Sequence, residues 1–65
     1  MTKYEGMLNL KLIRMKRKMT QQELGNLVGV NRKAICCYET GLRYPRRDML
    51  EKLADALGCE IKDIV

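Results

Sequence analysis

The sequence contains no histidine, no tryptophan and no phenylalanine, and its one proline is at position 45. With no histidine, no cluster of metal ligands and no phosphate-binding loop, the chain lacks the residue patterns of the common enzyme classes. Charged residues interrupt every apolar run well before the ~18 residues that a membrane-spanning helix requires. The first residues also lack the apolar stretch and the cleavage site of a secretory signal. We therefore expect neither an enzyme nor a membrane protein, and no small-molecule ligand.

Cysteine is scarce as well, and its three occurrences, Cys36, Cys37 and Cys59, do not suit a disulfide framework. Three sulfur ligands without histidine bind zinc only with a fourth partner, and adjacent cysteines on a helix point about 100° apart. We expect free thiols in a reducing cytoplasm, with no metal and no cofactor. A thiol switch is the alternative, because neighbouring cations favour the reactive thiolate form.

The length of 65 residues is enough for one domain only. A domain of about 60 residues buries roughly 60% of the surface that its unfolded chain exposes, so its stability margin is small. Without phenylalanine and tryptophan, the core must be built from Leu, Ile, Val, Met and Tyr, which a small helical bundle can do. We predict a single domain over residues 1–65, of which residues 1–6 form a short N-terminal arm.

Charge is distributed unevenly along the chain. Residues 1–47 carry eleven Lys and Arg against three Glu, a net charge of +8, whereas residues 48–65 carry two Lys against five Asp and Glu, a net charge of −3. A basic body with an acidic end indicates a polyanionic partner on one side of the molecule. An ordinary basic surface is the alternative that charge alone leaves open.

Apolar residues recur at helical spacing along most of the chain, and the only strand-like segment is the short AICCY, residues 34–38. The spacing predicts a first helix over residues 8–18, a second that begins after Thr20 and stops at Gly29, and a third from Asn31 to about Thr40. A fourth helix is predicted over residues 47–57 and a last turn over residues 60–65.

Two of these helices form a helix-turn-helix pattern. Thr20 and Glu23 have the spacing of a capping box, in which each side chain binds the other residue's backbone amide. Gly29 can adopt the left-handed backbone that ends the second helix abruptly, and Asn31 can cap the third. Gly25 falls where the two helices would approach closely. The sequence therefore predicts a compact all-α bundle with an embedded helix-turn-helix.

A series of segments in the same order and spacing occurs in a known family. The segments are LKLIR (10–14), TQQELG (20–25), VGVNRKAI (28–35), YETG (38–41), YP (44–45) and LEKLADALG (50–58), followed by Ile61 and Ile64. The chain thus resembles the phage repressor and Cro-like helix-turn-helix proteins, the Xre family of bacterial transcriptional regulators. The resemblance implies a five-helix domain that binds double-stranded DNA, usually as a homodimer on a palindromic operator. The chain departs from the family at Gly25, where Ala is common, at Arg47 and at Glu60.

In a helix-turn-helix motif, the later of the two helices places its first residues in the major groove of DNA, and in this chain that is the third helix. The resemblance therefore implies base contacts from the exposed side of the third helix, where Arg and Lys suit the O6 and N7 atoms of guanine. Asn31 can cap the helix, contact a base or do both, and Cys37 is placed for a thymine methyl group. A solvated basic helix face is the alternative. The base-contact candidates are Asn31, Arg32, Lys33, Cys36 and Cys37.

The resemblance also implies phosphate contacts and a structural ion pair. The family places a phosphate-binding glutamine at the start of the second helix, which is Gln21 here. Arg14 and Glu39 occupy positions where family members form a buried ion pair between the first and third helices. The phosphate-contact candidates are Gln21, Thr40, Arg43 and Tyr44.

The C-terminal residues Ile61, Ile64 and Val65 carry more apolar surface than a monomer of this size should leave exposed, and they are candidates for a dimer interface.

We expect a sequence-specific DNA-binding transcriptional regulator, a repressor that keeps polymerase from its operator. The alternative is a protein-interaction module or antitoxin on the same fold. A protein-interaction module would be expected to have a neutral or acidic surface on the third helix, whereas the third helix of this chain begins with Arg32 and Lys33.

Overall fold

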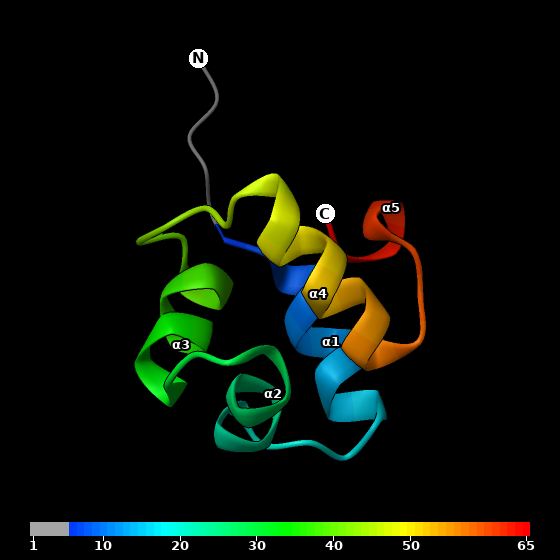
Figure 1. Ribbon diagram of the computed structural model, residues 1–65, viewed down its shortest axis with the longest axis horizontal. Helices are drawn as coiled ribbons and strands as arrows, with labels where there is room; N and C mark the ends of the chain where they lie inside the picture. Colours follow the sequence, from blue (N-terminus) through cyan, green and yellow to red (C-terminus); the bar gives the residue numbers. More distant parts are fainter. Residues whose placement is uncertain (1–5) are drawn as a thin grey trace.

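The computed structural model describes residues 6–65, so the arm predicted for residues 1–6 lies outside the described residues except for Gly6. The described chain forms five helices and no strand, which confirms the all-α fold and makes the AICCY segment helical. The helices are α1 (Leu8–Lys16), α2 (Gln21–Val28), α3 (Arg32–Thr40), α4 (Arg47–Leu57) and α5 (Ile61–Ile64) (Figure 1). Among residues 6–65, no helix has the length and the hydropathy to cross a membrane.

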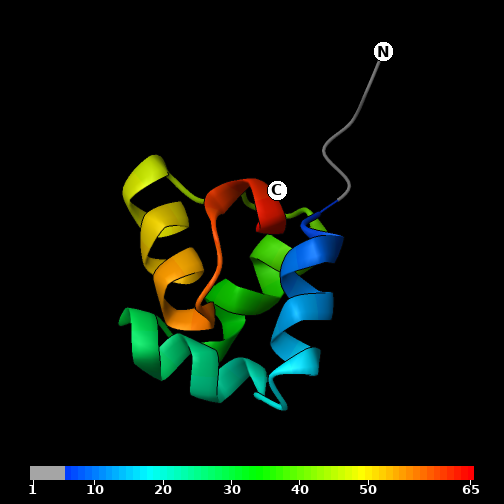
Figure 2. The same ribbon diagram turned by 90° about the vertical axis from the view of Figure 1, so that its right-hand side faces the viewer.

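Every helix contributes a fully buried side chain to one apolar core. α2 packs on both α3 and α4, and α5 lies against α1 and α4. Figure 2 shows α1 and α4 on opposite sides of the bundle, with α2 across the end below them and α5 near the other end. The fully buried side chains include Leu10, Leu24, Ile35, Leu53 and Ile64. Because the core needs all five helices, α2 and α3 are held at a fixed angle by the remaining three.

Local hydrogen bonds begin and end α2 and α3 where the sequence predicts. The amide of Glu23 donates to the hydroxyl of Thr20 over 3.0 Å, and the amide of Thr20 donates to the Glu23 carboxylate over 2.8 Å, which completes the capping box. Gly29 has a φ of +83°, the left-handed backbone that ends α2. The amide of Ala34 donates to the side-chain oxygen of Asn31 over 2.9 Å, which caps α3.

Gly25 is required by the close approach of α2 to the turn that follows it. A Cβ atom at this position would lie 2.6 Å from the carbonyl oxygen of Val30, closer than real Cβ contacts allow. Glycine costs about 1 kcal/mol of helix propensity relative to alanine. An alanine at this position would recover that energy but would clash with the Val30 carbonyl. Family members commonly have alanine here, whereas the tight turn of this chain leaves no room for an alanine Cβ atom.

The first helix ends two residues before its predicted end, because Lys18 adopts a left-handed backbone with a φ of +58°. The amide of Lys18 donates to the Met15 carbonyl over 2.9 Å, and the amide of Met19 donates to the Arg14 carbonyl over 3.1 Å. This pair of bonds is the Schellman motif, which usually has glycine at the left-handed position. No glycine marks the end of α1 in the sequence, so the pattern of strong helix formers predicted too long a helix.

The C-terminal turn also differs from its prediction. Ile64 is fully buried in the core, whereas Ile61 is partly buried and Val65 is half exposed. The side-chain amide of Asn9 donates to the Val65 carbonyl over 3.0 Å, which fixes the end of the chain to α1. Ile64 is therefore a core residue of the protomer, and its side chain is not available for a dimer contact.

The left-handed Lys18 leads to a stability prediction. A non-glycine residue in this conformation is disfavoured by roughly 1 kcal/mol relative to glycine. We expect Lys18→Gly to raise the midpoint of thermal unfolding by several degrees, as a change of about 1 kcal/mol does in a domain of this size. Circular dichroism melting curves measure the shift.

Lys16→Gly is the matched control, because it removes the same charge from the last residue of α1, where the backbone is helical. It should lower the melting temperature, since glycine is a poor helix former. Equal increases for both variants would mean that relief of charge repulsion, and not backbone strain, governs this turn.

Candidate nucleic-acid interface

Four side chains of α3 point away from the core and form what we call the recognition surface. They are Arg32, Lys33, Cys36 and Cys37. Ile35 and Tyr38, on the other side of the helix, are buried in the core. Arg32 and Lys33 are exposed, and within residues 6–65 neither side chain has a hydrogen-bond or ion-pair partner. Two unpaired cations thus project from the first turn of α3.

Asn31 precedes this surface and has a second polar group to offer. Its side-chain oxygen accepts the capping bond from Ala34, as described above. Its side-chain nitrogen carries two N–H donors, and the residue is exposed. Asn31 can therefore cap α3 and at the same time donate a hydrogen bond to an external acceptor.

The loop between α3 and α4 adds further positive charge. Arg43 and Tyr44 are exposed, and so is Arg46, whereas Pro45 is buried and anchors the loop. The amides of Leu42 and Arg43 donate to the Cys37 carbonyl, over 3.0 and 3.3 Å, so the loop starts close to the last turn of α3. The carboxylate on α3, Glu39, is buried and paired. From Arg32 to Arg47, the exposed charged side chains are all cations.

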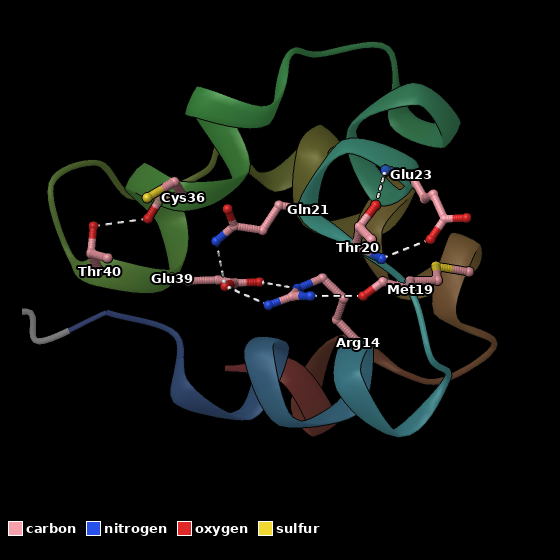
Figure 3. Close-up of polar contacts among 8 residues, drawn as sticks. All are labelled: Arg14, Met19, Thr20, Gln21, Glu23, Cys36, Glu39 and Thr40. Carbon is pink, nitrogen blue, oxygen red and sulfur yellow. Dashed lines mark hydrogen bonds and ion pairs between the residues drawn. The ribbon is translucent and has the colours of Figure 1, made fainter.

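A buried ion pair joins α1 to α3 (Figure 3). Arg14 of α1 donates from Nε to Glu39 Oε2 over 2.7 Å and from Nη2 to Glu39 Oε1 over 3.2 Å. Its remaining nitrogen, Nη1, donates to the Met19 carbonyl over 2.7 Å. The two side chains are only 9% and 2% exposed. The fork geometry satisfies both charges, which is the condition under which a buried pair is tolerated.

Gln21 belongs to this network as well as to the surface. Its side-chain nitrogen Nε2 donates to Glu39 Oε1 over 3.0 Å, and the residue is partly exposed at the start of α2 (Figure 3). This bond could not be predicted from local sequence patterns, because 18 positions separate the two residues. The glutamine expected to contact phosphate is thus held by the carboxylate expected to pair with Arg14.

Thr40, a further phosphate-contact candidate, is exposed at the end of α3, and its hydroxyl donates to the Cys36 carbonyl over 2.8 Å. A phosphate oxygen only accepts hydrogen bonds. The hydroxyl must therefore turn away from Cys36 before it can bind a phosphate.

The cysteines do not assemble a site within the described chain. All three thiols are free and partly buried, and residues 6–65 contain no group of three or more Cys, Asp or Glu side chains arranged to hold a metal ion. Cys59 packs against the core. Its burial raises the pKa of the thiol, and the negative charge of Asp63 acts in the same direction. Cys59 is therefore a poor nucleophile at neutral pH.

Two features escaped the sequence analysis. Arg17 donates from Nε to the Leu57 carbonyl at the end of α4 over 3.0 Å. On α1, three large apolar side chains at positions i, i+4 and i+7 are more than half exposed: Leu8, Leu12 and Met15. The spacing was visible in the sequence, but only the structure shows that this stripe faces away from the core.

Comparison with known proteins identifies the family of this chain. The sequence model of the helix-turn-helix family matches residues 10–64, which is most of the chain. The chain belongs to this family. The relatives described next confirm the resemblance to Cro/C1-type, or Xre, transcriptional regulators.

This helix-turn-helix protein is similar to the cryptic phage CTXphi transcriptional repressor RstR of Vibrio cholerae. The two are 34% identical over 53 residues, 82% of this chain and 48% of that protein, so the chain spans about half the length of this curated relative. The fold of this chain is similar to that of the restriction-modification controller protein C.AhdI from Aeromonas hydrophila, as seen in its crystal structure. The TM-score is 0.84 and the identity 28%, with 89% of this chain and 84% of that chain covered.

The burial of the ion pair leads to a prediction for Arg14→Ala. The substitution leaves the Glu39 carboxylate buried without its counter-charge, and removal of one partner of a buried pair destabilises by about 3–5 kcal/mol. Because small domains have only about 5–15 kcal/mol in total, we expect a large loss of stability. Urea unfolding followed by circular dichroism measures it.

Arg47→Ala is the matched control, since it removes one arginine from an ion pair with Glu51 whose side chains are 77% and 63% exposed. Exposed pairs contribute little, so we expect a change of at most about 0.5 kcal/mol. Similar losses for the two variants would show that burial does not decide the importance of the Arg14–Glu39 pair.

Proposed function

We propose that this chain binds double-stranded DNA sequence-specifically and acts as a transcriptional repressor in the cytoplasm. α3 lies in the major groove, and a homodimer occupies a palindromic operator. The observation that carries the proposal is the pair of exposed cations on the first turn of α3, Arg32 and Lys33, which have no partner among the described residues. The family membership and the repressor and controller functions named for its relatives support it.

Base recognition falls to the recognition surface. An arginine can donate two hydrogen bonds to the O6 and N7 atoms of guanine, and such a pair discriminates against other bases by roughly 1–3 kcal/mol. Arg32 and Lys33 are suited to this role because neither side chain has a bond to another residue within 6–65 that would have to break first. Asn31 offers its side-chain N–H groups to a base or a phosphate. Cys36 and Cys37 are small, weakly polar side chains, and Cys37 suits a thymine methyl group.

Phosphate contacts position the helix without reading the sequence. Gln21 lies at the start of α2, before α3, and Arg43 lies in the loop after α3, so contacts from both would fix the register of α3 in the groove. Thr40 and Tyr44 lie near Arg43 along the chain and add to the contacts at that end. Repression follows from occupancy, because a protein bound across an operator keeps polymerase from the same DNA.

The groove contacts predict different effects for two substitutions. Arg32→Ala should weaken binding to the preferred site and relax its sequence preference, because it removes a base contact. Gln21→Ala should weaken binding to all duplexes to a similar extent, because it removes a backbone contact. Selection of bound sites from random duplexes at fixed salt, followed by titration of the enriched site and of a random duplex, measures both.

Lys11→Ala is the matched control, since it removes one exposed positive charge from α1. It should preserve the sequence preference. Failure of the wild-type protein to enrich any site would favour the protein-interaction module instead, and wild-type selectivity in Arg32→Ala would refute the groove assignment.

The proposed homodimer uses the C-terminal end of the domain, where Ile61 and Val65 keep apolar surface exposed and Glu60 and Lys62 supply a polar rim. A dimer would space two copies of α3 by about one turn of DNA, roughly 34 Å. We expect Ile61→Glu to shift the protein to monomers and to weaken operator binding, since a charge in an apolar interface must be desolvated. Analytical ultracentrifugation measures the oligomeric state.

Leu12→Glu is the control, because Leu12 is 53% exposed on the apolar stripe of α1, outside the proposed interface. It should leave self-association unchanged. If Leu12→Glu dissociates the dimer and Ile61→Glu does not, the interface lies on α1 and the C-terminal assignment is wrong.

A further inference from the structure

Glu39 has almost no surface of its own, yet it is bonded to a residue that reaches the surface. We propose that Glu39 is a positioning residue for DNA binding, which orients the side-chain amide of Gln21 toward a backbone phosphate. The inference rests on the proposed function, because it assumes that Gln21 contacts DNA. It goes further in giving the buried ion pair a role in binding as well as in stability.

The orientation of the Gln21 amide follows from the chemistry of its partner. A carboxylate only accepts hydrogen bonds, so the amide must present its nitrogen, and not its oxygen, to Glu39. The 3.0 Å bond from Nε2 to Glu39 Oε1 has this arrangement. The bonds from Arg14 hold the carboxylate itself in place from the other side, as Figure 3 shows. Gln21 is therefore attached to a fixed point of the bundle.

The remaining donor of Gln21 is the group that a phosphate needs. The amide nitrogen carries two N–H bonds, of which one is directed to Glu39. A phosphate oxygen also only accepts, so it can bind the second N–H and not the amide oxygen. A glutamine without this anchor would rotate about its side-chain bonds, and its ordering would oppose binding. The bond to Glu39 removes part of that penalty before DNA arrives.

Arg14 makes this arrangement compatible with a phosphate nearby. An unpaired carboxylate behind Gln21 would repel the anionic DNA backbone. The two bonds from the Arg14 guanidinium neutralise that charge, and the third, to the Met19 carbonyl, fixes the guanidinium. The pair would be satisfied without Gln21, since Arg14 already binds both carboxylate oxygens. The bond to Gln21 is thus an addition that the ion pair itself does not require.

A thermodynamic cycle on DNA affinity tests the proposal. The double substitution Arg14→Met with Glu39→Met removes both charges at once, which folded proteins tolerate far better than removal of one. We expect Gln21→Ala to bind a random-sequence duplex about tenfold more weakly than wild type, the loss expected for one hydrogen bond to a charged group. The Arg14→Met/Glu39→Met variant should lose part of that factor, because its Gln21 side chain must be ordered when DNA binds. The triple variant should bind no more weakly than Gln21→Ala, because Glu39 acts on DNA binding only through Gln21.

The affinities are measured by fluorescence anisotropy at fixed salt, at a temperature where circular dichroism shows every variant folded. A merely structural role for Glu39 would change the melting temperature but not the affinity of the folded protein. As a control, Arg32→Ala on the Arg14→Met/Glu39→Met background should add its full effect on the enriched site, since Arg32 is outside the network.

The proposal is overturned if the folded Arg14→Met/Glu39→Met variant binds as tightly as wild type, or if its loss adds in full to that of Gln21→Ala. Wild-type affinity in Gln21→Ala also overturns it, although the proposed function would stand. Failure of the wild-type protein to bind any duplex is a separate result, since it removes the proposed function and the inference with it.

Discussion

The buried ion pair between Arg14 and Glu39 is the constraint on which the rest of the structure depends. Two charges can be removed from water only if each finds a complete set of partners, and a partial set destabilises more than an apolar core would. That set spans α1, the turn after it and α3, with Met19 and Gln21 as the outer members. Among residues 6–65, no buried side-chain nitrogen or oxygen lacks a partner. The network is therefore fully satisfied in the observed arrangement of the helices, and a shift of α1 relative to α3 would leave buried charges without partners.

The helix-turn-helix is built against this fixed arrangement by short-range packing. Gly25 lets the backbone of α2 approach the Val30 carbonyl, and Gly29 lets the chain reverse within a few residues. On the core side, Leu24 and Ile35 are fully buried. These contacts fix the angle of α3, and the ion pair fixes its position relative to α1. On the outward face of α3, Arg32 and Lys33 form no bond to another side chain or to the backbone within residues 6–65, so they are available to contact a partner.

The parts of this structure that sequence could predict are those set by nearby residues. The capping box of Thr20 and Glu23, the cap at Asn31 and the glycine stop of α2 each depend on residues within a few positions, and each was located correctly. The end of α1 was not, because Lys18 adopts a glycine-like backbone that only the path toward α2 explains. Burial of Ile64 and the bond from Gln21 to Glu39 depend on contacts between distant segments. Periodicity marks Ile64 as apolar but cannot say whether a core or a partner covers it.

Substitutions on the proposed DNA-binding face fall into two groups, according to whether the residue also makes a bond within the fold. Arg32 and Lys33 have no intramolecular bond within residues 6–65, so substitutions there alter what α3 presents without altering the fold. Gln21 and Asn31 each use one polar atom for the fold and keep another toward solvent. On the proposed function, base preference can therefore vary freely while the anchors at the two helix starts cannot. A substitution of Asn31 removes the cap of α3, and a substitution of Gln21 removes a bond to Glu39, so each also changes the contacts that hold the fold.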